Sequence, residues 1–200
     1  MSVSFARHAS LAALVAAAVA GFSSAASAHI GDHSHMGLVE GILHPFTGID
    51  HMLAMVAVGL WASQLGRPAL WLLPLTFPVV MAAGAAIGFS GSALPGVEIG
   101  IAASVLVLGA AVAFAVRPSL AVSAGLIAVF ALLHGYSHGV ELPADATALS
   151  FGAGFVAATL VLHAIGIGIG LLANRLPGHY IARAAGGAIA AAGVLLMVAA

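Results

Sequence analysis

The sequence predicts an all-α fold: a polytopic membrane bundle of six transmembrane helices that follows a cleaved N-terminal signal peptide. Two observations predict this class. Of the 200 residues, 62% are hydrophobic and only 6% are charged, and the mean hydropathy is +1.19, whereas a soluble domain carries about 25% charged residues. Apolar stretches of about 20 residues, the length that crosses a bilayer, also recur along the chain.

The first 28 residues have the features of a signal peptide. Arg7 supplies the positive charge, the apolar core "LAALVAAAVAGF" follows, and Ala26-Ser27-Ala28 matches the small-x-small cleavage pattern. The alternative is an uncleaved span, but a core of about a dozen residues is short for a bilayer. We expect cleavage after Ala28, which exports His29 to the periplasm. Residues 29–37 would then form a histidine-rich periplasmic N-terminus, which either gathers metal ions or is an ordinary disordered polar tail.

Six later segments are expected to span the membrane as one domain, residues 38–200. Glycine, proline and polar residues, which end helices, separate these segments. Their many glycines and alanines predict closely packed helices. The expected spans are residues 38–64, 69–90, 96–116, 119–141, 148–173 and 180–200.

The arginines predict how the bundle is oriented. Arg67, Arg117, Arg175 and Arg183 all fall at connections on one side of the predicted membrane domain. Basic residues mark the cytoplasmic side of inner-membrane proteins. We therefore expect both mature termini to lie in the periplasm, which agrees with an exported N-terminus. The expected location is the bacterial inner membrane, with lipid around the chain.

A first polar cluster lies where the first span begins on the periplasmic side. In "HPFTGIDHMLAM" it comprises His44, Asp50 and His51. Pro45 and Gly48 within the same stretch predict a half-broken helix. Such a backbone is tolerated in a membrane only where it lines protein or a wet cavity. The cluster therefore indicates a functional site.

A second polar cluster lies where the fourth span ends on that same side. In "LLHGYSHGVE", His134, His138 and Glu141 fall within about 60° of one another on a helix face. Glu98 begins the third span on this side, where an ordinary acid near a helix N-terminus is the alternative interpretation. His163 lies deeper, inside the fifth span, and it could instead be a neutral imidazole bonded to a backbone carbonyl.

The residue types indicate a borderline divalent metal ion. Imidazole and carboxylate without thiolate favour Ni²⁺, Co²⁺ or Zn²⁺, whereas Ca²⁺ and Mg²⁺ require almost only oxygen ligands. Asp50 could bond the His51 ring and fix its tautomer. Met52 and Met55 leave Cu(I) open, although methionine more often fills core space.

Other classes of function are disfavoured by what the sequence lacks. It has no cysteine, which excludes disulfides and thiolate metal sites. A net charge of −1 without a basic tract argues against nucleic acid as a partner. No G-x-x-x-x-G-K-[ST] motif occurs, so the chain is not expected to use ATP itself.

These residues resemble the HupE/UreJ family of membrane proteins. The resemblance rests on "HPFTGIDHMLAMVAVGLWA", "HGYSHGVE" and "FVAATLVLHAIGIGIG", and it covers essentially the whole chain. It implies a nickel (or cobalt) permease linked with hydrogenase and urease. The choice of nickel comes from the resemblance, because the residue chemistry also admits cobalt or zinc. The positions that match the family's functional motifs are His44, Asp50, His51, His134, His138 and Glu141.

We therefore expect a secondary permease that takes up nickel (or cobalt) for hydrogenase or urease maturation, with no enzyme activity and no tightly bound cofactor. The alternative is an intramembrane metalloenzyme, hydrolase-like, with a general base such as Glu141. The H-E-x-x-H motif of many metalloproteases is missing. Haem bound by paired histidines is a third possibility. The expected metal ligands are His44, Asp50, His51, His134, His138, Glu141, His163 and His29.

Overall fold

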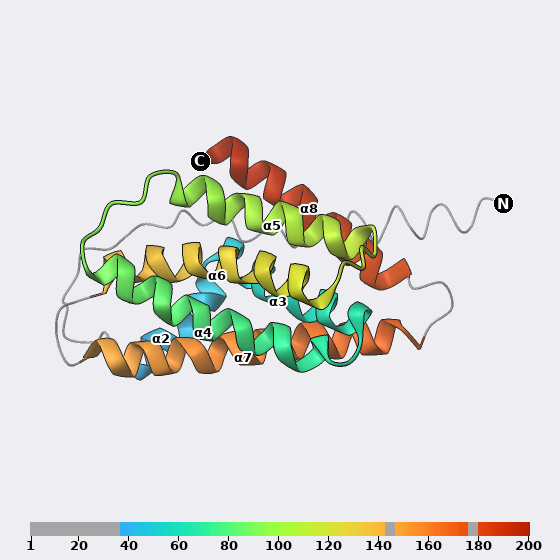
Figure 1. Ribbon diagram of the computed structural model, residues 1–200, viewed down its shortest axis with the longest axis horizontal. Helices are drawn as coiled ribbons and strands as arrows, with labels where there is room; N and C mark the ends of the chain where they lie inside the picture. Colours follow the sequence, from blue (N-terminus) through green and yellow to red (C-terminus); the bar gives the residue numbers. More distant parts are fainter. Residues whose placement is uncertain (1–36, 143–146, 176–179) are drawn as a thin grey trace. The chain divides into compact units, whose positions relative to one another are not determined.

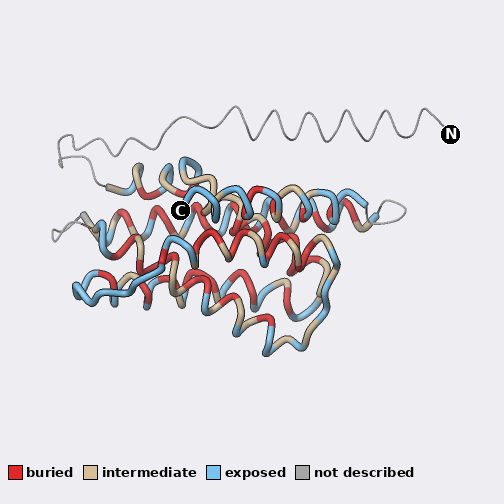
Figure 2. The backbone as a smooth tube through the Cα atoms, turned by 90° about the horizontal axis from the view of Figure 1, so that it is seen from above, coloured by how far each residue is buried: buried red, intermediate tan, exposed pale blue. Residues whose placement is uncertain are grey.

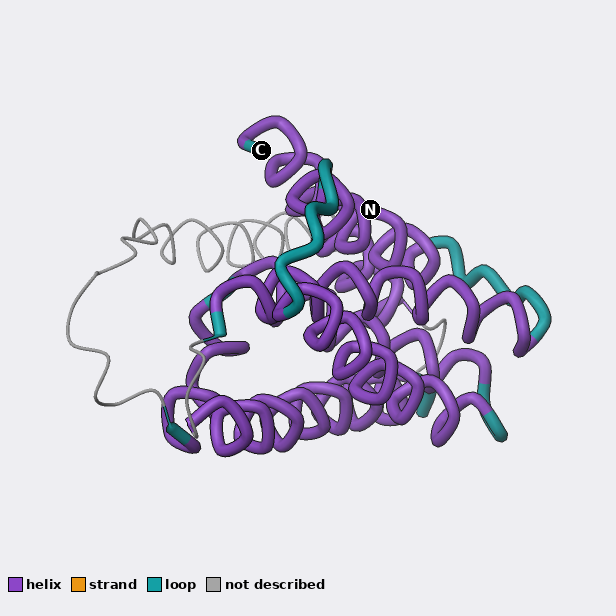
Figure 3. Tube along the Cα trace, turned by 60° about the vertical axis from the view of Figure 1, so that its left-hand side comes forward, coloured by secondary structure: helices purple, strands orange, loops and turns teal. Residues whose placement is uncertain are grey.

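The computed structural model describes residues 37–142, 147–175 and 180–200, and these ranges contain helices and connections but no strand (Figures 1 and 3). The predicted all-α class is confirmed. The expected signal peptide and residues 29–36, with His29, lie outside the described residues. The helices are α2 (Leu38–Thr47), α3 (Ile49–Leu65), α4 (Ala69–Phe89), α5 (Val97–Ala113), α6 (Leu120–Glu141), α7 (Thr147–Ala173) and α8 (Tyr180–Ala199).

Helices occupy all six segments that were predicted to span the membrane. Within the described residues, α4, α6, α7 and α8 are long and apolar enough to cross a bilayer. Helices α2 and α3 together make a fifth candidate, bent by 84°. Helix α5 is apolar but has only 17 residues. The chain is thus a multi-pass membrane protein with four to five candidate spans.

Large apolar side chains cover the outward faces of these helices. Val79 in α4, Leu149 in α7 and Val198 in α8 are all exposed. Buried residues follow the helix faces that meet one another inside the bundle (Figure 2). Soluble proteins rarely expose apolar surface on this scale. The pattern is that of a bundle whose outer surface faces lipid.

Glycines allow α4 and α6 to pack at very short range, and this pair makes the most extensive helix contact in the described residues. A Cβ atom added at Gly135 or Gly139 of α6 would clash with the carbonyls of Met81 and Ala85 in α4. Small residues are what permit such close approach of backbones. Each of these α6 glycines directly follows a histidine. Because neighbouring residues point about 100° apart on a helix, this contact fixes where the histidines point.

The bundle has two ends of different charge (Figure 1). We call them the histidine end (residues 38–51, 88–98 and 134–142) and the arginine end (residues 61–69, 112–120, 173–175 and 180–183). Every acidic residue in the described ranges lies at the histidine end: Glu40, Asp50, Glu98 and Glu141. Every arginine in these ranges lies at the other end: Arg67, Arg117, Arg175 and Arg183.

Side chains at the arginine end bind two carbonyls in the last turn of α5 and one carbonyl just beyond it. Trp61 donates from Nε1 to the carbonyl of Val116 at 2.9 Å. Gln64 donates from Nε2 to the carbonyl of Val112 at 3.0 Å. Arg183 of α8 donates to a third carbonyl in this region. The last carbonyls of a helix lack partners within the helix itself, so the bonds from Gln64 and Arg183 supply donors at the end of α5, and all three bonds tie α3 and α8 to this region.

Candidate metal site

The first polar cluster lies on both sides of the break between α2 and α3. His44 is in the last turn of α2, Gly48 separates the helices with an extended backbone, and Asp50 is in the first turn of α3. Pro45 cannot donate a helical hydrogen bond in that region. The predicted half-broken helix is confirmed. On a straight helix seven residues rise about 10 Å, yet the ring centroids of His44 and His51 are 6.5 Å apart.

Four imidazole rings from three helices meet at the histidine end. The ring centroid of His138 lies 4.8 Å from that of His44 and 4.5 Å from that of His51. The ring of His134 lies 4.8 Å from His51. The exposed fractions of His51, His134 and His138 are only 8%, 0% and 7%. The two sequence clusters therefore form one group, which we call the histidine cluster (His44, His51, His134 and His138).

Hydrogen bonds determine which nitrogen of two of these rings can bind a metal. His51 Nδ1 lies 2.7 Å from Asp50 Oδ1, and His134 Nδ1 lies 2.9 Å from the Phe130 carbonyl oxygen. Carbonyls and ionised carboxylates only accept, so Nδ1 carries the hydrogen in both rings. Nε2 then bears the lone pair. Both Nε2 atoms are buried and have no hydrogen-bond partner, which leaves them available to a ligand.

A metal ion could also be held by residues nearer the end of α6. Both ring nitrogens of His138 are buried without a hydrogen-bond partner. One ligand atom from each of His44, His138 and Glu141 lies within 4.8 Å of the others. Imidazole nitrogens with a carboxylate oxygen suit a borderline divalent ion. The sequence predicts that His134, His138 and Glu141 share one face of a helix, and the last two of these lie together beside His44.

The acidic residues of this end differ in what they contact. Asp50 Oδ1 accepts from both the backbone N–H of His51, at 2.8 Å, and its ring. Asp50 therefore orients an imidazole, as carboxylates beside metal-binding histidines do. Glu98 is exposed in the first turn of α5, close enough to Glu141 for the two carboxylates to repel each other.

His163 lies apart from the histidine cluster, deeper in the bundle on α7. Phe77 of α4 packs between them, with its ring centroid 5.5 Å from His134 and 5.4 Å from His163. Phe155 of α7 packs on His138 at 4.4 Å. Sequence reasoning did not single out either phenylalanine. Phe155 could have been found from its spacing to His163, because residues eight apart lie on the same face of a helix.

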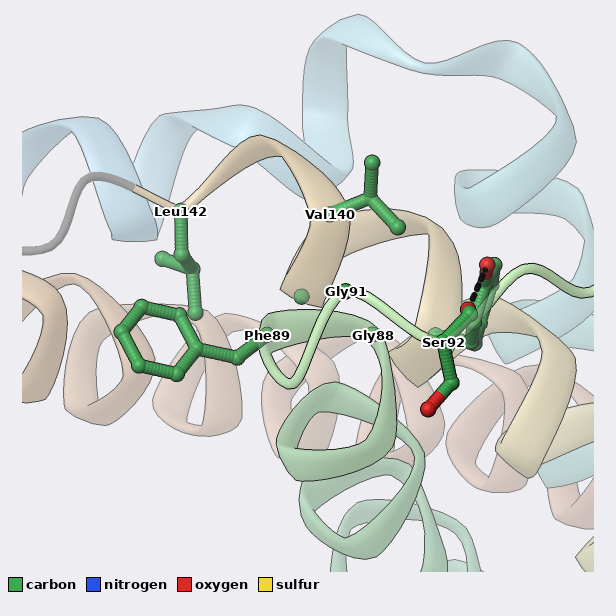
Figure 4. A pocket seen from close by; sticks show the side chains of 8 residues that line it. Gly88, Phe89, Gly91, Ser92, Val140 and Leu142 are labelled. Atoms are coloured by element: carbon green, nitrogen blue, oxygen red, sulfur yellow. Dashed lines mark hydrogen bonds between the residues drawn. The ribbon is translucent and has the colours of Figure 1, made fainter.

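A separate pocket of about 500 Å³ lies beside the 90–96 connection (Figure 4). Tyr136 donates its hydroxyl hydrogen to the Ser92 carbonyl at 2.5 Å and accepts from the Leu94 N–H at 2.9 Å. These bonds hold the connection against α6. None of the described residues that line the pocket has an ionisable group suited to a metal, so it is not the metal site. They are Gly88, Phe89, Gly91, Ser92, Tyr136, Gly139, Val140 and Leu142.

Comparison with known proteins identifies the family. The sequence model of the HupE / UreJ protein family matches residues 17–196. The chain belongs to the HupE/UreJ family. It is also 49% identical, over 175 residues, to protein HupE from Rhizobium leguminosarum bv. viciae. The aligned residues cover 88% of this chain and 91% of that relative. No solved structure matches the chain.

The match to the HupE/UreJ family includes both halves of the histidine cluster. The predicted family is therefore confirmed. HupE/UreJ proteins are membrane proteins associated with nickel uptake for hydrogenase and urease, and they are not a family of enzymes. Membership thus disfavours the intramembrane hydrolase that the histidine spacing alone left open.

Proposed function

We propose that this protein is a secondary permease that moves Ni²⁺, or Co²⁺, into the bacterial cell to supply hydrogenase or urease maturation. The observation that carries the proposal is the histidine cluster, because buried imidazole nitrogens without partners occur inside a multi-pass membrane protein. Ionisable groups inside a membrane are costly and mark ion pathways. Family membership supports nickel over the zinc that the ligand chemistry also admits.

The proposed topology has six spans after a cleaved signal peptide, residues 1–28. Helix α5 would cross as a short span, because 17 residues extend about 26 Å, close to the hydrocarbon thickness of about 30 Å. The positive-inside rule assigns the arginine end to the cytoplasm. The histidine end then faces the periplasm, and an incoming ion meets it first.

In this proposal the ion exchanges water for protein ligands in two steps. His44, His138 and Glu141 would bind it first, because they lie toward the end of the bundle. The Nε2 atoms of His51 and His134 would take it further in. Several exchangeable neutral nitrogens bind more weakly than a closed thiolate cage, which suits release. The membrane potential favours inward movement of a divalent cation by about 4.6 kcal/mol per 100 mV, twice the single-charge value.

Uptake by purified protein in liposomes tests this function. Proteoliposomes with an inside-negative potential should accumulate ⁶³Ni²⁺, and protein-free liposomes should not. An excess of unlabelled Co²⁺ or Zn²⁺ in parallel samples measures selectivity. A protein that binds nickel at equilibrium but never carries it into the vesicle would contradict the permease and favour a metal-binding or enzymatic role.

A further inference from the structure

A row of side chains on α7 leads from the histidine cluster into the bundle. Phe155, Thr159 and His163 follow one another at intervals of four residues, with exposed fractions of 3%, 0% and 1%. Each interval rises about 6 Å along the helix. Phe155 packs on His138 of the cluster. Thr159 and His163 therefore lie about one and two turns further toward the arginine end.

The Thr159 hydroxyl differs from the helical hydroxyls of Thr76 and Ser63 in having no hydrogen-bond partner. Thr76 donates to the carbonyl of Leu72, at 2.7 Å, and Ser63 donates to that of Leu60, at 2.7 Å. Such back-bonding is the usual arrangement for a hydroxyl within a helix. The Oγ1 atom of Thr159 is buried and has no hydrogen-bond partner. A buried hydroxyl without a partner costs free energy, which a ligand would recover.

The ring nitrogens of His163 also lack hydrogen-bond partners. Both of its nitrogens are buried and lack a partner of hydrogen-bond geometry. The carbonyl of Pro74 in α4 interacts with the ring. This carbonyl lacks its usual helical donor, because that donor would be the N–H of residue 78 and Pro78 has none. Helix α4 therefore presents toward the deep histidine a backbone oxygen that has no helical hydrogen bond to a residue 78 N–H.

We infer that Thr159, His163 and the carbonyl of Pro74 form a second, inner metal site through which the ion leaves the histidine cluster. The inference rests on the proposed permease function and extends it. One imidazole nitrogen and two neutral oxygens can bind a borderline divalent ion. They bind it weakly, because no carboxylate takes part. A weak site after a stronger one is what conduction through several sites requires.

Phe77 accounts for why two sites exist rather than one. Its ring contacts both His134 and His163, so an apolar group separates the histidine cluster from the inner site. An ion that passes this ring loses the ligands on one side before it gains all those on the other. The ligands beyond the ring then determine the rate of transfer, whereas the histidine cluster determines the affinity for external metal.

Kinetics of ⁶³Ni²⁺ uptake by full-length variants in proteoliposomes test the inner site. Thr159→Val keeps the shape and removes the hydroxyl, and loss of one neutral ligand should lower the maximal rate about three- to ten-fold. His163→Leu should lower it more than about ten-fold. The half-saturating Ni²⁺ concentration should stay within about two-fold of wild type, because the histidine cluster is intact. Thr159→Ser should restore most of the rate.

Thr76→Val is the matched control, because its hydroxyl is used within its own helix; the maximal rate should not change. Wild-type rates in both Thr159→Val and His163→Leu would overturn the inner site while leaving the permease intact. A rise in half-saturating concentration without a fall in rate would also overturn it. No uptake by wild-type protein would overturn the permease, and the inner site with it. If His163→Leu does not fold, Thr159→Val alone decides.

Discussion

The two ends of the bundle use polar side chains in opposite ways. At the arginine end, the donors of Trp61, Gln64 and Arg183 each reach a carbonyl near the end of α5. At the histidine end, Nε2 of His51 and Nε2 of His134 are buried and reach nothing. Nearly all buried polar atoms in proteins are hydrogen-bonded. The contrast shows that buried nitrogens without a hydrogen-bond partner, more than polarity itself, distinguish the candidate ligand site from the scaffold.

The charged residues are also divided between the two ends. All acidic residues in the described ranges lie at the histidine end, and all arginines in those ranges lie at the other. Acidic groups around the mouth of a site raise the local concentration of cations. The end with unsatisfied nitrogens is therefore also the end that attracts a divalent ion. Variants at each end can test whether this division is functional.

The largest effect is expected from His138→Ala. His138 contacts both His44 and His51, so its loss removes the ring that joins the two halves of the histidine cluster. Nickel uptake should fall to less than about a tenth of wild type. His179→Ala is a control of the same residue type: His179 follows Leu176-Pro177-Gly178 in the connection before α8, outside the described residues, and this sequence predicts an ordinary loop residue. Equal loss of ⁶³Ni²⁺ uptake in both variants would undo the site assignment.

A loss nearly as large is expected from Asp50→Asn. The amide that replaces the carboxylate is uncharged, so its oxygen accepts more weakly from Nδ1–H of His51 and holds the ring less firmly with Nε2 free for a metal. Loss of an orienting carboxylate typically costs about 10–100-fold in metal affinity. Equilibrium dialysis of solubilised protein against ⁶³Ni²⁺ measures this, and uptake should fall in parallel. An unchanged affinity would show that the Asp50–His51 bond does not orient a ligand.

Much of this arrangement could be predicted from local sequence. The length of each apolar run, together with the glycines and prolines that end it, correctly predicted a helix in every segment. Both features are local, because they depend only on residues within or next to that segment. The meeting of residues 44–51 with residues 134–141 was also predictable, because alternating spans bring both to one side. The break at Gly48 could be predicted because Pro45 removes a donor and Gly48 resists helix.

Apart from His163, the inner residues could not be predicted in the same way. Thr159 and Thr76 look alike in sequence, and only the packed bundle shows that one hydroxyl is used and the other is not. Phe77 acquires its place between His134 and His163 from the rotation of α4 against two other helices. Such features depend on contacts between distant segments, which residue periodicity does not encode.

An intermediate effect is expected from Gly139→Ala, at the contact between α4 and α6 that fixes where His134 and His138 point. In Gly139→Ala the new methyl group would meet the backbone of Ala85 in α4, and such overpacking costs about 1–3 kcal/mol. The apparent melting temperature in detergent should fall, and nickel affinity with it. Gly125→Ala on the same helix is the control, because a Cβ there meets nothing within 4 Å. A loss of stability in Gly125→Ala as large as in Gly139→Ala would contradict this packing argument.

The smallest effect is expected from Gln64→Leu at the arginine end. The variant loses a bond to the Val112 carbonyl, but that carbonyl still accepts from the N–H of Ala115 at 3.1 Å. It also loses Oε1 of Gln64, a buried oxygen without a partner. The lost hydrogen bond and the removal of an unpaired buried oxygen have opposite effects, so the free energy of unfolding should change by less than about 1.5 kcal/mol. Nickel uptake should stay within about two-fold of wild type, because no ligand is affected and distant sites act independently. A loss of uptake as deep as that of His138→Ala would mean that the two ends do not differ in the way their hydrogen bonds indicate.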